Sequence, residues 1–166
     1  MGDTAKLTIR HEMISPPDSP LEGPGNKGIV TNNSNGRSWI GGTSSGEADR
    51  NYFVEGALGA GGADNYDLLA AGSLTDIQAR AIDADELKAI TVKCLTGDIK
   101  IGATATNGIG IFSAASEGVI LSAGQTVSFD LGSDGISVEV DSKFTISEVG
   151  APSAAATYEL AMTIAQ

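Results

Sequence analysis

Short segments in which every second residue is apolar follow one another from Asn51 to the end of the chain, joined by turns rich in glycine and serine. The clearest is residues 126–131, where Val127, Phe129 and Leu131 alternate with polar residues. Because successive side chains of a strand point to opposite faces of a sheet, this pattern predicts a half-buried antiparallel strand. Turn residues recur about every 8–12 positions, which favours a sandwich or a barrel over an α/β fold.

Residues 87–95 are the best candidate for a central strand, because apolar residues occupy both of its faces. One face holds Ile90, Val92 and Cys94, and the other holds Leu87, Ala89 and Leu95. The tight turn at residues 96–98 then predicts a hairpin with residues 99–101.

We expect further strands at residues 51–58 and 66–71, joined across residues 59–64, and at residues 119–121, 136–140, 144–146 and 158–165. Residues 74–86 are expected to form a bend with one helical turn at most, because the segment is too short for a stable helix. Ile109, Ile111 and Phe112 are predicted to form a loop that closes one end of the module. The predicted fold class is therefore all-β: an antiparallel β-sandwich or jelly-roll-like module, preceded by an extended N-terminal arm.

We expect residues 1–50 to form that arm and residues 51–166 to form the β module. Within the arm, residues 6–13 can form one short strand. Its apolar side carries Leu7, Ile9 and Met13, and its polar side carries Lys6, Thr8, Arg10 and Glu12. Prolines at positions 16, 17 and 20 exclude continuation of this segment as a central strand.

Residues 15–49 consist mainly of turn-forming residues, and such a long stretch is uncommon inside a compact domain. They are either a flexible linker or an extended segment that becomes ordered only on the surface of a partner. Trp39 favours the second interpretation, because a tryptophan in a polar segment is typical of an interface anchor. The candidate partner-binding residues of the arm are Leu7, Ile9, Ile29, Val30, Trp39 and Ile40.

The charge of the chain limits its partners. Its 166 residues include 21 Asp and Glu against 10 Lys and Arg, a formal net charge of −11. Such a surface repels phosphates, so we expect neither direct nucleic-acid binding nor binding to an anionic membrane. No signal peptide is expected from the first residues, and no stretch approaches the roughly 20 apolar residues that span a bilayer.

The usual catalytic and cofactor-binding patterns are missing from the sequence. The chain has one histidine, His11, and one cysteine, Cys94, which are too few for a structural zinc site. Cys94 is in phase with apolar residues and is expected to be a small buried hydrophobic residue. The glycine clusters lack the Lys-Ser/Thr pair of a phosphate-binding loop. We therefore predict that the protein is not an enzyme and has no cofactor.

Carboxylates are the remaining candidates for chemistry. Asp130 and Asp134 flank a glycine-rich turn, and Asp141 follows the next predicted strand. Calcium takes six to eight oxygen ligands, and this turn could supply some of them. The spacing does not match an EF-hand loop, so no metal site is assigned. A glycosidase pair of carboxylates is disfavoured because aromatic residues, which stack on sugars, make up only 5% of the chain.

Several segments of the β module carry a resemblance to a known class of protein. They are residues 66–68, 82–93, 97–103, 120–129 and 156–160, about 100 residues from first to last. The order of these segments resembles that of accessory structural proteins of tailed bacteriophages, which are small β-sandwich proteins of the virion. The resemblance implies a decoration (cement) protein, often a homotrimer, that binds the major capsid protein and copies of itself. It also implies a place on the exterior of the capsid, after assembly in the host cytoplasm.

A tail- or fibre-associated host-recognition module is the alternative. Such a carbohydrate-binding-like module would use exposed loops at residues 107–115 or 130–135, with calcium as an option.

Overall fold

The computed structural model describes residues 48, 50–70, 72–77, 79–114, 116–150 and 155–166. The chain divides into two units, Met1–Trp39 and Ile40–Gln166, and every described residue belongs to the second. The predicted strand at residues 6–13 and the six candidate partner-binding residues, Leu7, Ile9, Ile29, Val30, Trp39 and Ile40, therefore lie outside the described residues.

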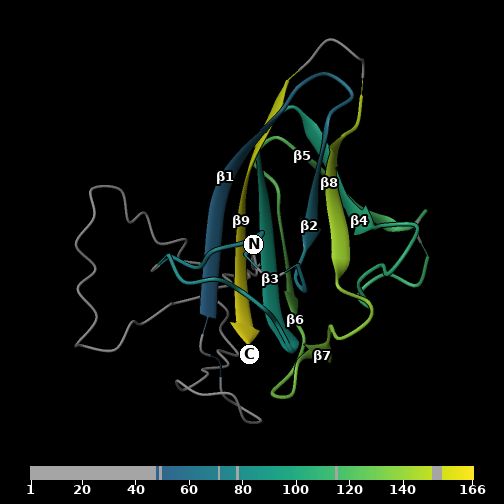
Figure 1. The fold of residues 1–166 in the computed structure, drawn as a ribbon. Helices are drawn as coiled ribbons and strands as arrows, with labels where there is room; N and C mark the ends of the chain where they lie inside the picture. The colour runs from purple at the N-terminus through teal and green to yellow at the C-terminus, as the bar shows by residue number, and fades with distance from the viewer. Residues whose placement is uncertain (1–47, 49, 71, 78, 115, 151–154) are drawn as a thin grey trace, which may run out of the picture. The chain divides into compact units, whose positions relative to one another are not determined.

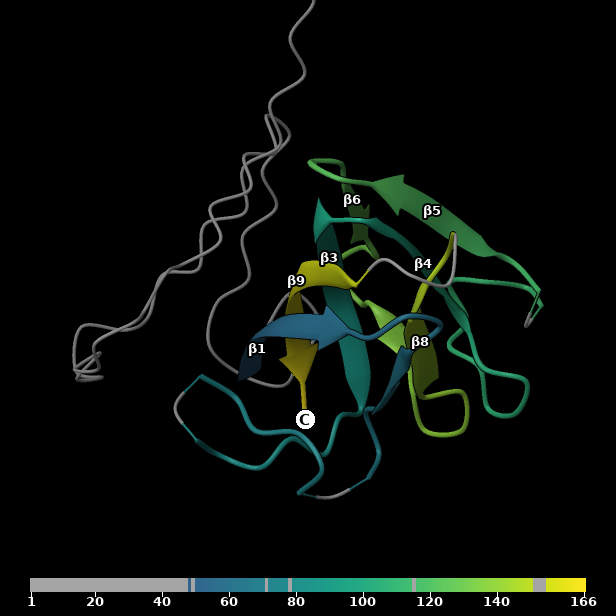
Figure 2. The same ribbon diagram turned by 90° about the horizontal axis from the view of Figure 1, so that it is seen from above.

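The described residues form two antiparallel sheets (Figure 1). The first sheet contains β1 (Arg50–Leu58), β9 (Ala156–Ala165), β3 (Glu86–Thr96) and β6 (Thr126–Asp130), in that order, and β7 (Ile136–Ser137) also pairs with β3. The second contains β2 (Ala63–Asp67), β8 (Lys143–Glu148), β4 (Asp98–Ala103) and β5 (Gly118–Ser122). Seen from above, the sheets form two facing layers (Figure 2).

The strand order is that of a jelly roll. β1 pairs with β9, β2 with β8, β3 with β6 and β4 with β5, so the chain runs as one long antiparallel hairpin. The successive strand pairs of this hairpin belong alternately to the first and the second sheet. The long hairpin is therefore rolled up into a two-layer sandwich. The prediction of an all-β sandwich or jelly-roll-like module is confirmed. The strand pairing shows that the sandwich is a jelly roll.

The hairpin predicted at residues 96–98 is wrong. β3 and β4 are joined by Gly97 alone but belong to different sheets. Because β9 and β6 already occupy both edges of β3, no edge is left for β4. Gly97 has φ +71°, and a Cβ there would lie 3.0 Å from the Cβ of Ala156, so glycine suits this sharp crossing.

Two predicted strands have different bounds in the structure. The strand expected at residues 66–71 is β2, which starts earlier because Gly62 N–H donates to Gly59 C=O at 2.8 Å and closes the turn. It ends at Asp67, whose side chain accepts Leu69 N–H at 3.1 Å and turns the chain. The strand expected at residues 136–140 is only the two-residue β7. Because β6 pairs with residues 89–93 of β3, only Glu86 and Leu87 remain on the same edge of β3 for β7 to pair with. Val140 is therefore 68% exposed.

A β-bulge corrects the predicted faces of β3. The register on β9 shifts between Leu87 and Ala89, so that Leu87 lies opposite Ile164 and Ile90 lies opposite Met162. Leu87 thus joins Ile90, Val92 and Cys94 on the core face, whereas strict alternation predicted the other face. The extra residue, Lys88, is fully buried.

The core lies between the two sheets. Its largest fully buried apolar side chains are Tyr158, Phe144, Leu68, Ile82, Leu87, Ile90, Ile99, Ile101, Ile109, Ile146 and Leu160. Ile109 comes from the loop after β4, and Ile111 and Phe112 pack against the core, as predicted for a loop that closes the module. Within the described part of the chain there is no helix, and so none long and apolar enough to cross a membrane.

Candidate interaction surfaces

The outer face of the β1–β9–β3–β6 sheet carries short side chains at its centre, and we name this outer face the small-residue face. At its centre, Thr163 lies opposite Ala89 and Ala161 opposite Thr91. Their exposed fractions are 5%, 3%, 9% and 1% respectively. The outer face of an antiparallel sheet usually carries longer polar side chains that reach into water. At its centre this face instead carries short side chains that are nearly inaccessible.

Hydroxyl groups on the small-residue face bond along the sheet. Thr91 Oγ1 lies 2.9 Å from Ser128 Oγ on the neighbouring strand, and Thr96 Oγ1 lies 2.8 Å from Thr157 Oγ1. Side chains held down in this way do not protrude.

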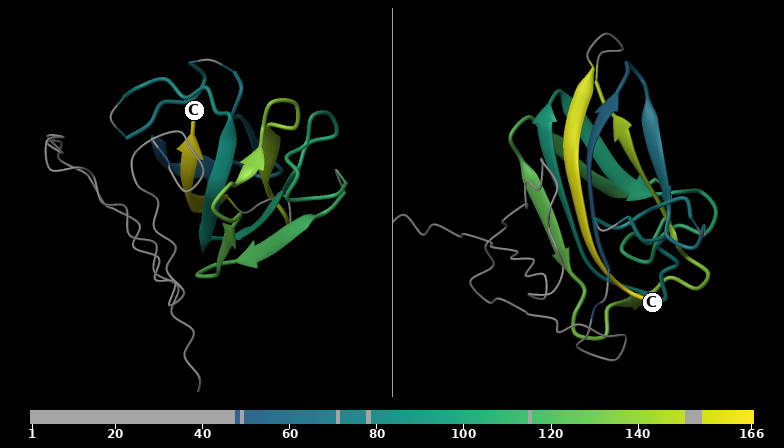
Figure 3. Two further views of the ribbon diagram at one scale, coloured as in Figure 1. Left: turned by 90° about the horizontal axis from the view of Figure 1, so that it is seen from below. Right: turned by 60° about the vertical axis from the view of Figure 1, so that its left-hand side comes forward.

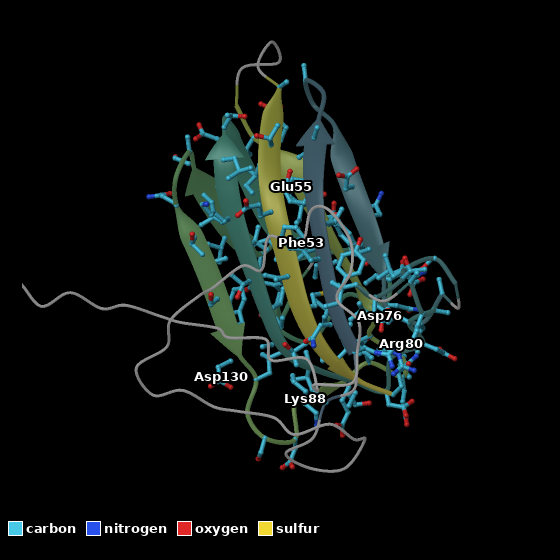
Figure 4. All side chains as sticks on the ribbon, turned by 90° about the vertical axis from the view of Figure 1, so that its left-hand side faces the viewer. Phe53, Glu55, Asp76, Arg80, Lys88 and Asp130 are labelled. Atoms are coloured by element: carbon cyan, nitrogen blue, oxygen red, sulfur yellow. The ribbon has the colours of Figure 1, made fainter. Side chains whose placement is uncertain are left out.

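One row of the small-residue face is charged. Glu55 of β1 lies opposite Glu159 of β9, which in turn lies opposite Lys93 of β3. The Lys93 ammonium pairs with Glu159 at 3.4 Å. Like charges directly opposite each other destabilise a sheet. A second cation near Glu55 would therefore stabilise this row. Figure 4 shows Glu55 and its neighbour Phe53 on this side of the molecule.

The outer face of the other sheet has a different character. Asn65 and Ile120 are exposed there, Ile120 by 60%, and Lys100 is half-buried. Lys143 pairs with Asp67 at 3.3 Å. This face carries exposed polar and apolar side chains and a surface ion pair, and of the two outer faces we take the small-residue face as the candidate for contact with a protein surface.

A buried polar chain links the two sheets. Tyr158 of β9 donates its hydroxyl hydrogen to Asp64 Oδ2 of β2 at 2.5 Å, and its oxygen lies 2.5 Å from that of Tyr66, also in β2. With Tyr158 donating to Asp64, the Tyr66 hydroxyl donates to Tyr158. Burial raises the pKa of Tyr158 well above its usual value and that of Tyr66 to about 12. Both phenols therefore stay protonated at neutral pH and act as structural links between the sheets.

Aromatic rings surround this chain of hydrogen bonds. Tyr66 stacks on Phe144 of β8 with ring centroids 4.9 Å apart, and Tyr52 of β1 meets Tyr66 edge-on at 6.3 Å. The contacts join β1 to β2 and β2 to β8. Sequence reasoning missed the cluster, and the one signal for it was a glycine, Gly56, inside a strand pattern.

Two buried charges fix loops at the end of the module where β9 terminates. Lys88 donates to the carbonyl oxygens of Ser133 (3.1 Å) and Asp134 (3.0 Å) and forms an ion pair with Glu86, which holds the β6–β7 turn. Asp76 accepts from Arg80 Nε at 2.6 Å and from its backbone N–H at 2.8 Å, which holds the loop before β3. Figure 4 labels Lys88, Asp76 and Arg80. Both buried charges bond to loop residues, which assigns them a structural role.

The structure places the other residues considered for chemistry as follows. Cys94 is fully buried, as predicted; its thiol donates to Gly97 C=O at 3.3 Å, and burial raises its pKa. Asp130 accepts Gly132 N–H at 3.0 Å, within its own turn. Among the described residues, no three side chains of the His, Cys, Asp or Glu type are placed to hold a metal ion. His11 lies outside them.

Comparison with known proteins gives no family. No protein-family model matches the chain, and no curated protein matches it. One matching solved structure comes from work on Bacillus endospore appendages, described as a family of disulfide-linked pili. It is 13% identical, with 76% of this chain and 98% of that chain covered, and has a TM-score of 0.25. A likeness at that level carries no argument about fold or function.

Proposed function

We propose that the protein is a structural virion protein that binds and stabilises a bacteriophage capsid shell as a decoration protein. The observation that carries the proposal is the contrast between the two outer faces of the jelly roll. One carries exposed side chains such as Asn65 and Ile120, and the other has four short central side chains that are less than 10% exposed. The resemblance of the β module to accessory virion proteins supports the same function, and jelly rolls occur in viral capsid domains. Fold alone does not determine function, so the proposal depends on the face.

In this mechanism the small-residue face lies against the major capsid protein. Short side chains allow close packing over a wide area, which favours contact between proteins. The arm adds apolar anchors, Ile29, Val30, Trp39 and Ile40, which become ordered on the shell. Copies of the chain, as a homotrimer, then place several weak contacts on one shell, and multivalency turns them into firm attachment.

The charge of the module fits a place outside the shell. Residues 50–166 contain 15 Asp and Glu and six Lys and Arg, a net charge of −9. Packaged DNA would repel such a module, so the exterior is the favourable side.

The proposal is tested by co-sedimentation of the purified protein with empty, expanded shells of the phage whose genome encodes it. We expect saturable binding. Ala161→Glu, which places a charge at the centre of the small-residue face, should weaken binding at least about tenfold. Thr145→Glu, on the outer face of the other sheet, is the matched control and should leave binding unchanged.

Deleting Met1–Trp39, which leaves the second unit whole, should also weaken binding strongly. Equal binding by wild type and Ala161→Glu would refute the role of the face. Binding to host cells or glycans in place of shells would point to the host-recognition alternative.

A further inference from the structure

The outer edge of β1 pairs with no strand among the described residues. β1 is the longest edge strand of the two sheets, and it pairs over its nine residues only with β9. Asn51 shows which backbone groups point away from β9, because its carbonyl accepts Ile77 N–H at 3.0 Å, outside the ladder. In an antiparallel ladder every second residue directs both of its backbone groups to the same side. Phe53, Glu55 and Ala57 therefore also direct their N–H and C=O groups to the outer edge.

These outward groups form a template for another extended chain. Within the described part of the chain, no hydrogen bond reaches the outward N–H and C=O groups of Phe53, Glu55 and Ala57. A row of such groups on an edge strand can pair with a further strand, which completes the ladder. Recognition by strand addition takes its affinity from these main-chain hydrogen bonds and its specificity from the side chains at alternate positions.

The charge at this edge selects what can pair there. Glu55 is exposed, lies opposite Glu159 and forms no ion pair with a described residue. Lys93, in the same row, already pairs with Glu159 at 3.4 Å. An extended segment with a lysine or arginine opposite Glu55 would give the row two cations for its two carboxylates. Opposite charges at facing positions stabilise a sheet.

A second copy of β1 is a poor occupant of the same edge. Antiparallel pairing of two β1 edges centred on Glu55 would place the two Glu55 carboxylates directly opposite each other, which destabilises a sheet. The net charge of −9 on residues 50–166 adds repulsion between copies. Charge complementarity therefore favours a basic segment of another protein.

The inner face of β1 sets the residues on either side of the cation. Tyr52 and Val54 point into the sandwich, and Val54 is only half-buried although it packs against the core. Neighbouring side chains of a paired strand alternate between the two faces. Apolar residues before and after the cation would therefore lie on the inner face, where one of them would cover Val54.

We propose that the outer edge of β1 binds an extended segment of a partner protein, with a lysine or arginine opposite Glu55 and apolar residues on either side of it. The segment adds a strand to the sheet, and the pair with Glu55 fixes its register. Assigning this segment to the major capsid protein rests on the proposed function, whereas binding at the edge does not. The tests below use no shell, so their failure is distinguishable from failure to bind shells.

A capped peptide, acetyl-Val-Thr-Val-Arg-Val-Thr-Val-amide, tests the charge selection with the full chain. Calorimetric titration should show saturable binding of one peptide per chain. Glutamate in place of the central arginine should weaken binding at least about fivefold. Glu55→Lys should reverse this preference. Glu139→Lys makes the same change of charge on an exposed residue after β7, and it should keep the wild-type preference. No saturation by about 1 mM peptide, or an unchanged preference in Glu55→Lys, would overturn the proposal.

Amide hydrogen exchange locates the bound peptide. Saturating peptide should slow exchange of the N–H groups of Phe53, Glu55 and Ala57 at least about tenfold. The N–H groups of Tyr52 and Val54 point toward β9 and serve as internal controls, with unchanged rates. Slowing confined to other parts of the module would place the peptide elsewhere and overturn the proposal. Slowing at the edge that depends on protein concentration without peptide would show that a second copy holds it, which also overturns the proposal.

Discussion

The ring of Tyr158 in β9 lies directly over Gly56 in β1. The two residues are paired in the sheet, and a Cβ built on Gly56 would lie 2.1 Å from Cζ of Tyr158. The ring can reach Asp64 and Tyr66 on the facing sheet because position 56 carries no side chain. Figure 3 (right) shows β9 between β1 and β3, where this contact lies.

Gly56→Ala should therefore destabilise the protein by about 2 kcal/mol, because the added methyl group forces the Tyr158 ring away from its partners. Urea unfolding measures the change. Gly59→Ala is the control, since a Cβ there meets nothing within 4 Å, and it should have little effect. The cost of Gly56→Ala should shrink in a Tyr158→Ala background. An undiminished cost would show that the ring is not the cause.

Ionisation of the tyrosines should require a pH above 10. The chain has three tyrosines, Tyr52, Tyr66 and Tyr158, and burial raises the pKa of each above its usual 10.0. Because the folded state favours the neutral phenols, their contribution to stability is complete below pH 10 and is lost as pH rises through about 12. Tyrosinate absorbance should stay flat near pH 10 and then rise together with unfolding. A normal titration step at pH 10 in the folded protein would contradict the buried cluster.

Lys88→Met should cost about 3 kcal/mol of stability in chemical denaturation. The methionine keeps most of the side-chain volume but removes the ammonium that donates to Ser133 C=O and Asp134 C=O and pairs with Glu86. Lys93→Met removes an ammonium from a partly exposed surface pair and should cost less than about 1 kcal/mol. Similar costs for the two variants would rule out a special role for the buried lysine.

The carboxylate of Asp67 should stabilise the folded protein at neutral pH, and this contribution should be lost in acid. Burial alone raises the pKa of its carboxyl, but hydrogen bonds from the Ser142 hydroxyl (2.8 Å) and Leu69 N–H (3.1 Å), together with Lys143, lower it below the usual 3.8. The contribution is present above that pH and is lost as pH falls through the folded-state pKa. Asp67→Asn should thus be less stable than wild type at pH 7, and the difference should vanish at low pH. A difference independent of pH would exclude the ionised carboxylate as its source.

Local patterns predicted most of the strands but not their partners. Alternation located the strand with Val127 and Phe129 correctly, and it placed Cys94 in the core. It could not show that the turn at Gly97 crosses between sheets, because that depends on which strands already flank β3. The bulge at Lys88 broke the strict period of two, so the face of Leu87 was wrong.

The candidate surfaces could not be predicted for the same reason. Ala161 and Thr91 are unremarkable in the sequence, and they lie side by side on one face only because β9 pairs with β3. The link between Asp64 and Tyr158 joins positions 94 residues apart. Such contacts depend on the rolled topology rather than on neighbouring residues.

The most direct test of the decoration function is electron microscopy of phage particles assembled with and without this protein. We predict additional density at symmetry-related positions on the outer surface of the shell, into which the jelly roll fits with its small-residue face toward the capsid. The density should be absent from particles that lack the protein. Density confined to the tail, or identical shells in the two samples, would contradict the account.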